Sequence, residues 1–248
     1  MAILETTSAS PPVDVGNASA NSPLRTVGRQ LLTHDLIFDF GSWLYAWMTH
    51  NPVWHANAAH LLDHLPPAQA QLHVLDLGAG PGNSTLAMRA HRPTARFIAF
   101  DLAQQMLELA QQNRLRAGVS RQQLAPVRGD ALRLPLPTAS VDVVTGHSFL
   151  YLLPDYQGVL AEAWRVLRPG GYVAFLEPRA GRVDWAWLWQ QRSTGLHISL
   201  TLWRFYSWLH RRFSTVSLAA ALTEAGFQDV TTEVTLGGFG LFGRGRKA

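Results

Sequence analysis

Residues 73–85 read HVLDLGAGPGNST, an apolar run with one acid that breaks into three alternating glycines. Glycines in such a turn let the backbone take positive φ angles and approach a ligand closely, and a helix that follows directs its free N–H groups toward an anion. The stretch therefore predicts a nucleotide-binding turn. The dinucleotide fingerprint would place its third glycine where Asn83 stands, which argues against a nicotinamide or flavin cofactor.

Acidic residues recur at the ends of successive predicted strands. Asp101 ends an apolar stretch about twenty residues after the glycines, where an acid can receive both hydroxyls of a ribose. Asp76 lies in the first strand, and Gly129-Asp130-Ala131 follows the third. Each Asp could instead be a helix cap or a solvated loop acid. Ligands of open α/β sheets bind outside the carboxyl ends of the strands, so three acids along one edge favour a shared ligand.

Predicted strands and helices alternate along the chain, which indicates a parallel, doubly wound sheet. After the glycine turn we expect strands at 96–101, 124–128, 141–144 and 172–177, helices at 103–117 and 155–167, and a turn at 168–171. In the helix 155–167, the residues expected to face the core are Leu160, Ala163, Trp164 and Leu167.

These pieces resemble the ordered motifs of the class I S-adenosylmethionine-dependent methyltransferases, most closely the ubiquinone and menaquinone biosynthesis type. The resemblance covers roughly residues 70–178 and a C-terminal hairpin, with four motifs in register. It implies a mostly parallel, seven-stranded sheet under a helical lid, with S-adenosylmethionine as cofactor. The cofactor-binding residues it implies are Asp76, Gly78, Ala79, Gly80, Gly82, Asp101, Leu102, Met106, Gly129, Asp130, Ala131 and His147.

Length and composition fit one domain with additions. We expect a disordered tail at 1–28 and a methyltransferase domain at 29–248, with an N-terminal helical cap at 34–65 and a lid insertion at 183–213. The chain has no cysteine, which excludes disulfides and thiolate metal sites, and a net charge of +4 is too small to argue for nucleic acid. The basic end, Arg244, Arg246 and Lys247, is expected to be solvated. No leader or membrane span is evident, so a cytoplasmic protein is expected.

Two segments are added to the cofactor-binding core: the N-terminal cap, 34–65, is the first addition, and the lid insertion, 183–213, is the second. Eight of the nine tryptophans lie in these two additions. Most of them are expected to pack the lid on the sheet, and the remainder to line an apolar pocket for a small hydrophobic substrate. The second addition also contains four arginines, Arg192, Arg204, Arg211 and Arg212. They are either a solvated helix face or a contact with an anionic membrane surface.

His147, expected just after the fourth strand, is the candidate general base. Methyl transfer from a sulfonium needs alignment of the reacting atoms, and a neutral imidazole can accept a proton from the methyl acceptor near pH 7. His147 could equally be a structural histidine or a cofactor contact. Tyr151 and Glu177, at the edge of the opening that His147 faces, are further catalytic candidates.

A histidine cluster precedes the glycine turn. His60 and His64 lie four residues apart, with His50, His55 and Asp63 nearby. Beyond Asp63, no carboxylate completes a convincing ligand set in the sequence, so no metal site is expected.

The sequence therefore predicts an S-adenosylmethionine-dependent methyltransferase that acts on a small hydrophobic metabolite of the quinone precursor, tetrapyrrole, sterol or lipid type. The alternative is a non-catalytic module that keeps the fold to bind a nucleotide-like ligand or a protein partner.

Overall fold

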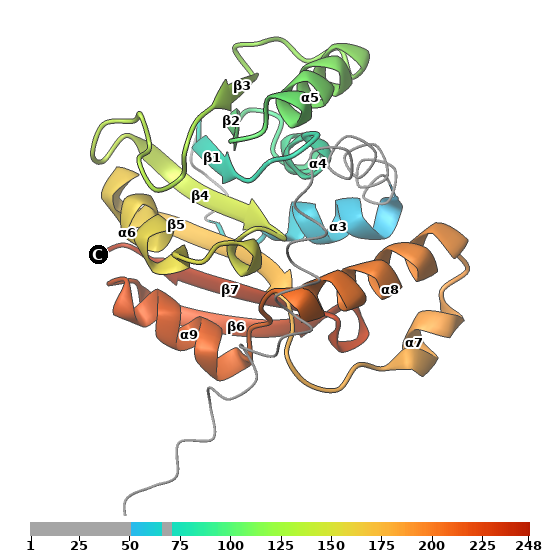
Figure 1. Cartoon of the computed structure of the whole chain (residues 1–248). Coiled ribbons are helices and arrows are strands. Elements are labelled where there is room, and N and C mark those ends of the chain that lie inside the picture. Colours follow the sequence, from blue (N-terminus) through green and yellow to red (C-terminus); the bar gives the residue numbers. More distant parts are fainter. Residues whose placement is uncertain (1–50, 66–70) are drawn as a thin grey trace, which may run out of the picture.

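In the computed structural model of the chain, described for residues 51–65 and 71–248, seven strands form one sheet in the order β3-β2-β1-β4-β5-β7-β6. Strands β1 to β5 are parallel and β7 is antiparallel to both neighbours, which confirms the predicted mostly parallel, doubly wound sheet (Figure 1). The strands are β1 His73–Leu77, β2 Arg96–Asp101, β3 Leu124–Arg128, β4 Val141–His147, β5 Leu167–Pro178, β6 Gln228–Thr235 and β7 Gly240–Arg246.

Helices cover both faces of this sheet. They are α3 Pro52–His60, α4 Asn83–His91, α5 Gln104–Arg116, α6 Tyr156–Val166, α7 Trp185–Gln190, α8 Thr194–Leu209 and α9 Thr215–Glu224, with short 3₁₀ turns η1 Leu150–Leu152 and η2 Leu236–Gly238. Successive side chains of a strand point to opposite faces of the sheet, so alternate strand residues belong to two different cores. Leu75 and Val144 join the core under α6 and α9, whereas Val74 and Val143 join the core beside α4.

A third, smaller core links elements that are distant in sequence. Trp54 of α3 packs with Leu196, Leu200 and Trp203 of α8, together with Leu188 of α7. Figure 1 shows α3 and α8 at the end of the sheet toward which β4 and β5 point. The described part of the N-terminal addition and the second addition are therefore both helical, as predicted, and they meet at the carboxyl edge of the sheet.

Several predicted boundaries differ from the structure. The turn expected at 168–171 is part of β5, because Gly170 N–H donates to Lys247 O at 2.8 Å and Lys247 N–H donates to Gly171 O at 2.8 Å. The fourth strand runs on to His147, so that residue ends β4 and does not follow it. The disordered tail expected at 1–28 and the first part of the cap, up to residue 50, lie outside the described residues.

Two expectations about individual side chains are wrong. Trp164 is 39% exposed, because it lies on the edge of α6 where the Lys247 ammonium stacks on its ring. Of the basic end, only Arg246 is exposed to solvent. Arg244 and Lys247 are 8% and 6% exposed, and Lys247 Nζ donates to the carbonyls of Trp164 and Leu167 at 2.7 and 2.8 Å. Pairing of β7 with β5 draws this end into the sheet.

Candidate functional site

The glycine turn joins β1 to α4 at the centre of the carboxyl edge. Gly78, Gly80 and Gly82 have φ angles of 63°, 53° and 76°, the left-handed region that side chains other than glycine rarely adopt. Gly82 is the N-cap of α4, and Ala79 N–H donates to Phe100 O at 3.1 Å. Strand order reverses between β1 and β4, and such a switch point is where open α/β sheets bind ligands.

Asp101 lies against this turn, as predicted. Its Oδ2 accepts a hydrogen bond from Gly80 N–H at 2.8 Å, and its Oδ1 accepts one from Ala103 N–H at 2.9 Å. Burial raises the pKa of Asp101, whereas these backbone hydrogen bonds lower it. The carboxylate therefore fixes the glycine turn to the end of β2.

Asp76 is buried beneath the turn. Its Oδ2 accepts from Thr85 Oγ1 at 2.5 Å and its Oδ1 from Thr145 Oγ1 at 3.0 Å, which ties α4 and β4 to β1. Burial raises the pKa of this carboxyl to about 6. Asp76 lines the cavity of the site, yet both oxygens already serve protein hydroxyls, so its main observed role is to hold the turn in place.

The other predicted contacts lie at the ends of β2 and β3. Gly129 N–H donates to Asp101 O at 3.0 Å, and Arg128 Nε donates to Leu102 O at 3.1 Å, which joins the two strand ends. Asp130 is exposed, and its Oδ1 accepts from Leu132 N–H at 2.9 Å in its own turn. In the same region Leu102 is exposed, and Met106 and Ala131 are half-buried.

His147 faces the glycine turn from the end of β4. Its Nδ1 lies 2.6 Å from Ser84 Oγ in the first turn of α4, and its Nε2 is buried with no hydrogen-bond partner within the described residues. Burial lowers the pKa of His147 to about 4, so the imidazole is neutral at physiological pH. A cavity of about 10 Å³, room for one water molecule, is lined by Asp76, Gly78, Ala79, Pro81, Asn83, Ser84 and His147.

Two tryptophans of the additions close this end of β4. The rings of Trp54 and His147 have centroids 5.1 Å apart, and Trp54 meets Trp203 edge to face at 5.0 Å. Trp203 Nε1 donates to Ser148 Oγ at 2.7 Å, and Trp54 Nε1 donates to Ser199 Oγ at 2.9 Å. Each indole thus has its polar group satisfied while its ring packs over the site.

The loop after β4 covers the glycine turn. A Cβ added at Gly78 would lie 2.2 Å from Phe149 Cδ2, so the Phe149 ring rests directly on that glycine. Glu177 of β5 is fully buried, and its carboxylate accepts the N–H groups of Phe149, Leu150 and Tyr151 at 3.1, 2.8 and 3.1 Å. Burial raises the pKa of Glu177 to about 7. Its position indicates that it holds this loop in place.

Tyr151 is not at the opening where the sequence placed it. It is 4% exposed, packs in the core under α6 and lies near the rings of Tyr206 and His210. The 3₁₀ turn η1 directs the Tyr151 side chain inward, and no sequence motif predicts this turn. Sequence reasoning also missed Pro81, Asn83, Ser84 and Phe149, although Asn83 and Ser84 open the helix whose N-terminus was expected to face a ligand.

The arrangement fits the methyl donor that the motifs imply. A left-handed glycine turn lets a ligand approach the backbone, Asp101 lies beside it, and the buried Nε2 of His147 has no hydrogen-bond partner in the described part of the chain. The small cavity shows that Phe149 and the two tryptophans are closed over the turn in this conformation.

Comparison with known proteins agrees with this site. The methyltransferase domain family matches residues 75–175. The demethylmenaquinone methyltransferase of Lactiplantibacillus plantarum is 34% identical over 173 residues, which span 64% of this chain and 71% of that enzyme. The chain belongs to the class I S-adenosylmethionine-dependent methyltransferases, and its cofactor is S-adenosylmethionine. Its sequence is similar to the ubiquinone and menaquinone biosynthesis type.

Two further relatives match over shorter stretches. The demethylmenaquinone methyltransferase of Deinococcus radiodurans is 39% identical over 122 residues, or 49% of this chain and 47% of that enzyme. The trans-aconitate 2-methyltransferase of Azoarcus sp. is 38% identical over 106 residues, or 43% of this chain and 39% of that enzyme. The chain thus spans less than half the length of these two relatives.

Solved structures share the fold. Phosphoethanolamine N-methyltransferase 2 of Haemonchus contortus, in complex with S-adenosyl-L-methionine, has a TM-score of 0.65 at 15% identity, covering 88% of this chain and 59% of that one. The [4+2]-cyclase SpnF has a TM-score of 0.57 at 20% identity, covering 75% of this chain and 62% of that one. At these identities the likeness concerns the fold alone.

Proposed function

We propose that this chain transfers a methyl group from S-adenosylmethionine to a small hydrophobic metabolite. One observation carries the proposal: the neutral imidazole of His147 lies between Ser84, at the glycine turn, and Trp54, in the helical addition. A methyl donor on the turn and an apolar acceptor under the tryptophans would meet at this imidazole. The proposed domain is residues 29–248, with α3 and α7–α8 forming its lid.

In the proposed reaction the acceptor attacks the methyl carbon in line with the sulfur, and the bound cofactor supplies the methyl group and a neutral thioether leaving group. The protein's contribution is alignment of the two molecules and exclusion of water. We propose that Asp101 and the turn Gly78–Gly82 hold the donor, with Leu102, Met106 and Gly129–Ala131 beside it. His147 Nε2 would accept the proton that an acidic O–H or C–H of the acceptor releases.

An apolar acceptor is favoured over an acidic one. The cavity at the glycine turn is lined by no lysine or arginine that could pair with an acidic acceptor. The Trp54 ring packs on His147, and the Trp203 ring packs on Trp54. Demethylmenaquinone is named as the substrate of two of the relatives. A quinone precursor therefore heads the substrate classes to test, ahead of tetrapyrroles, sterols and lipids.

The alternative is that the fold binds the donor without transferring its methyl group. SpnF shares this fold and is named a [4+2]-cyclase, so the fold by itself does not imply methyl transfer. The two functions differ in one observable, which is turnover. A non-catalytic module would bind S-adenosylmethionine and release none of its demethylated product.

The test is incubation of the purified full-length protein with methyl-radiolabelled S-adenosylmethionine and a lipid extract or a demethylated quinone. We expect label in the organic phase and stoichiometric S-adenosylhomocysteine. His147→Ala should lower turnover by ~10²–10⁴, with a smaller loss at alkaline pH where the acceptor ionises unaided. The control is His73→Ala, at the amino end of β1, which should match wild type. Donor binding without label transfer from lipid or polar extracts would overturn the proposal.

We also propose that the lid contacts a membrane surface, which would give access to a lipophilic acceptor. The exposed face of α8 carries Ile198, Leu202, Phe205 and Trp208 at helical spacing, 39–61% exposed. Among the described residues, no helix combines the length and apolar character needed to cross a bilayer. Co-sedimentation with anionic vesicles should be weakened by Phe205→Ser, and equal sedimentation of both proteins would refute the contact.

A further inference from the structure

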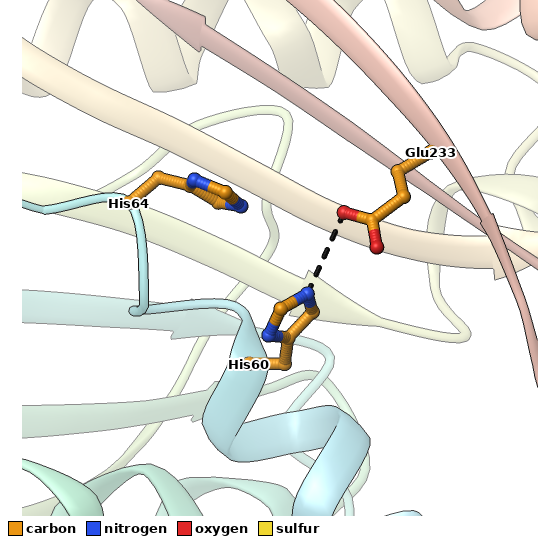
Figure 2. Close-up of side chains that lie close together, drawn as sticks. All are labelled: His60, His64 and Glu233. Atoms are coloured by element: carbon orange, nitrogen blue, oxygen red, sulfur yellow. Dashed lines mark ion pairs between the residues drawn. The ribbon is translucent and has the colours of Figure 1, made fainter.

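Three potential metal ligands converge where α3 faces the edge strand β6. His60 ends α3, His64 follows one turn later, and Glu233 lies in β6, far away in the sequence. One ligand atom from each of the three lies within 4.8 Å of those of the other two. Figure 2 shows the two imidazoles and the carboxylate directed toward the same space. No metal site was expected from the sequence because Asp63 is the carboxylate near these histidines in the chain, whereas the fold brings Glu233 to them.

A second carboxylate orients the cluster. His60 Nδ1 is hydrogen-bonded to Asp63 Oδ2, while the opposite ring nitrogen, Nε2, lies 3.5 Å from Glu233 Oε2. Asp63 is itself held by His91, whose Nε2 lies 2.7 Å from Asp63 Oδ1. A histidine that uses one ring nitrogen on a carboxylate and presents the other to a shared point is the usual arrangement around protein-bound zinc.

We propose that His60, His64 and Glu233 bind a zinc-like divalent cation, with solvent completing the coordination. Two imidazole nitrogens and one carboxylate oxygen form a ligand set that Zn²⁺ accepts. His60 is half-buried, and His64 and Glu233 are exposed, so a cation has direct access from solvent. The site lies on the sheet edge formed by β6 and is separate from the glycine turn, so it does not depend on the proposed methyl transfer.

The charges around the cluster set its affinity. Arg244 Nη1 lies 2.8 Å from Glu233 Oε2 and competes with a cation for that oxygen. We therefore expect moderate affinity, in the micromolar range, and tighter binding when Arg244 is replaced by Gln.

A cation bound to His60, His64 and Glu233 would stabilise the position of the lid helix α3. The cation would fasten the end of α3 to β6, and the same helix carries Trp54, which packs on His147. A ligand that binds the folded protein and not the unfolded chain raises its stability. Zinc is therefore expected to raise the melting temperature and to slow hydrogen exchange in α3.

The experiment is calorimetric titration of ZnCl₂ into the untagged, chelator-treated full-length protein, with CoCl₂ spectra as a report on coordination. We expect one saturable site. His64→Gln and Glu233→Gln should each abolish it, Asp63→Asn should weaken it ~10–100-fold, and His197→Gln should leave it unchanged. These ligands are surface residues, and circular dichroism without metal establishes that each variant is folded.

Two outcomes would overturn the proposal. One is the absence of saturable zinc binding by the wild-type protein. The other is zinc binding of equal affinity in folded His64→Gln and Glu233→Gln, which would place the metal elsewhere, for example on histidines that precede residue 51. Both outcomes leave the proposed methyl transfer untouched, because that reaction is measured with a separate assay.

Discussion

Gly78 combines the two constraints that make a residue irreplaceable. Its φ of 63° disfavours any side chain, and the Phe149 ring occupies the space where a Cβ would lie. The same close approach shows that the turn is built to have groups packed directly on its backbone. In the closed conformation that group is Phe149, and we infer that a bound donor takes its place.

Gly78→Ala should therefore destabilise the fold through both strain and overlap, by ~1–3 kcal/mol. Combining it with Phe149→Ala should recover the part caused by overlap, so the two substitutions should not be additive. Urea unfolding of the two single variants and the double variant measures this coupling. Strict additivity would show that the ring and the glycine do not constrain each other.

Glu177 is the residue whose role the structure revises most. Its carboxylate accepts three backbone N–H groups, and Glu177→Ala would leave these buried donors without an acceptor. We expect a loss of ~1–3 kcal/mol in the free energy of unfolding. The exposed Glu224→Ala serves as the control and should change it by less than ~0.5 kcal/mol. Equal stability of the two variants would contradict a structural role for Glu177.

Among the elements, α8 is the one whose packing links the lid to the site. Trp203 contributes both its ring, against Trp54, and its N–H, to Ser148. Trp189, in α7 of the same addition, is by contrast 71% exposed. One of these tryptophans is buried and the other exposed. Comparing their substitutions therefore distinguishes loss of lid packing from the mere loss of an aromatic ring.

Trp203→Ala should loosen α8 and speed amide hydrogen exchange over 194–209, because it removes a large buried side chain at a cost of ~3–5 kcal/mol locally. Trp203→Phe should give a smaller effect, and Trp189→Ala almost none. Exchange followed by mass spectrometry reports each peptide separately. Identical exchange of Trp203→Ala and Trp189→Ala would show that Trp203 does not hold the lid.

Elements with strong local signals could be predicted from the sequence. The sheet follows from alternating apolar runs, and the glycine turn and Asp101 follow from spacing along the chain. What failed depends on contacts between distant segments: η1 turns Tyr151 inward, and pairing of β7 buries Lys247. The contact of His147 with Ser84 and the approach of Glu233 to His60 also arise from tertiary packing, and no local pattern encodes them.

At the scale of the whole molecule, three buried titratable groups make stability depend on pH in opposite directions. The pKa of His147 is lowered to about 4, so its contribution is complete above pH 6.5 and is lost as the pH falls toward 4. The pKa values of Asp76 and Glu177 are raised to about 6 and about 7, so their contributions are complete in acid and are lost as the pH rises through those values.

His147→Gln isolates one of these contributions. It removes the ionisable ring, so the variant should lose less stability than wild type between pH 6.5 and 4, by up to about 3 kcal/mol. Urea unfolding at several pH values in that window gives the two curves. If wild type and variant lose stability in parallel, His147 is not the buried neutral group that the structure indicates.

Binding of S-adenosylmethionine at the glycine turn is the central claim, and calorimetric titration of the cofactor tests it most directly. The proteins to compare are wild type, Gly80→Val and Gly118→Val, since Gly118 has a similar φ of 64° with no atom within 4 Å of an added Cβ. The account predicts micromolar binding by wild type and Gly118→Val, and none by folded Gly80→Val. Unchanged affinity in folded Gly80→Val would contradict it.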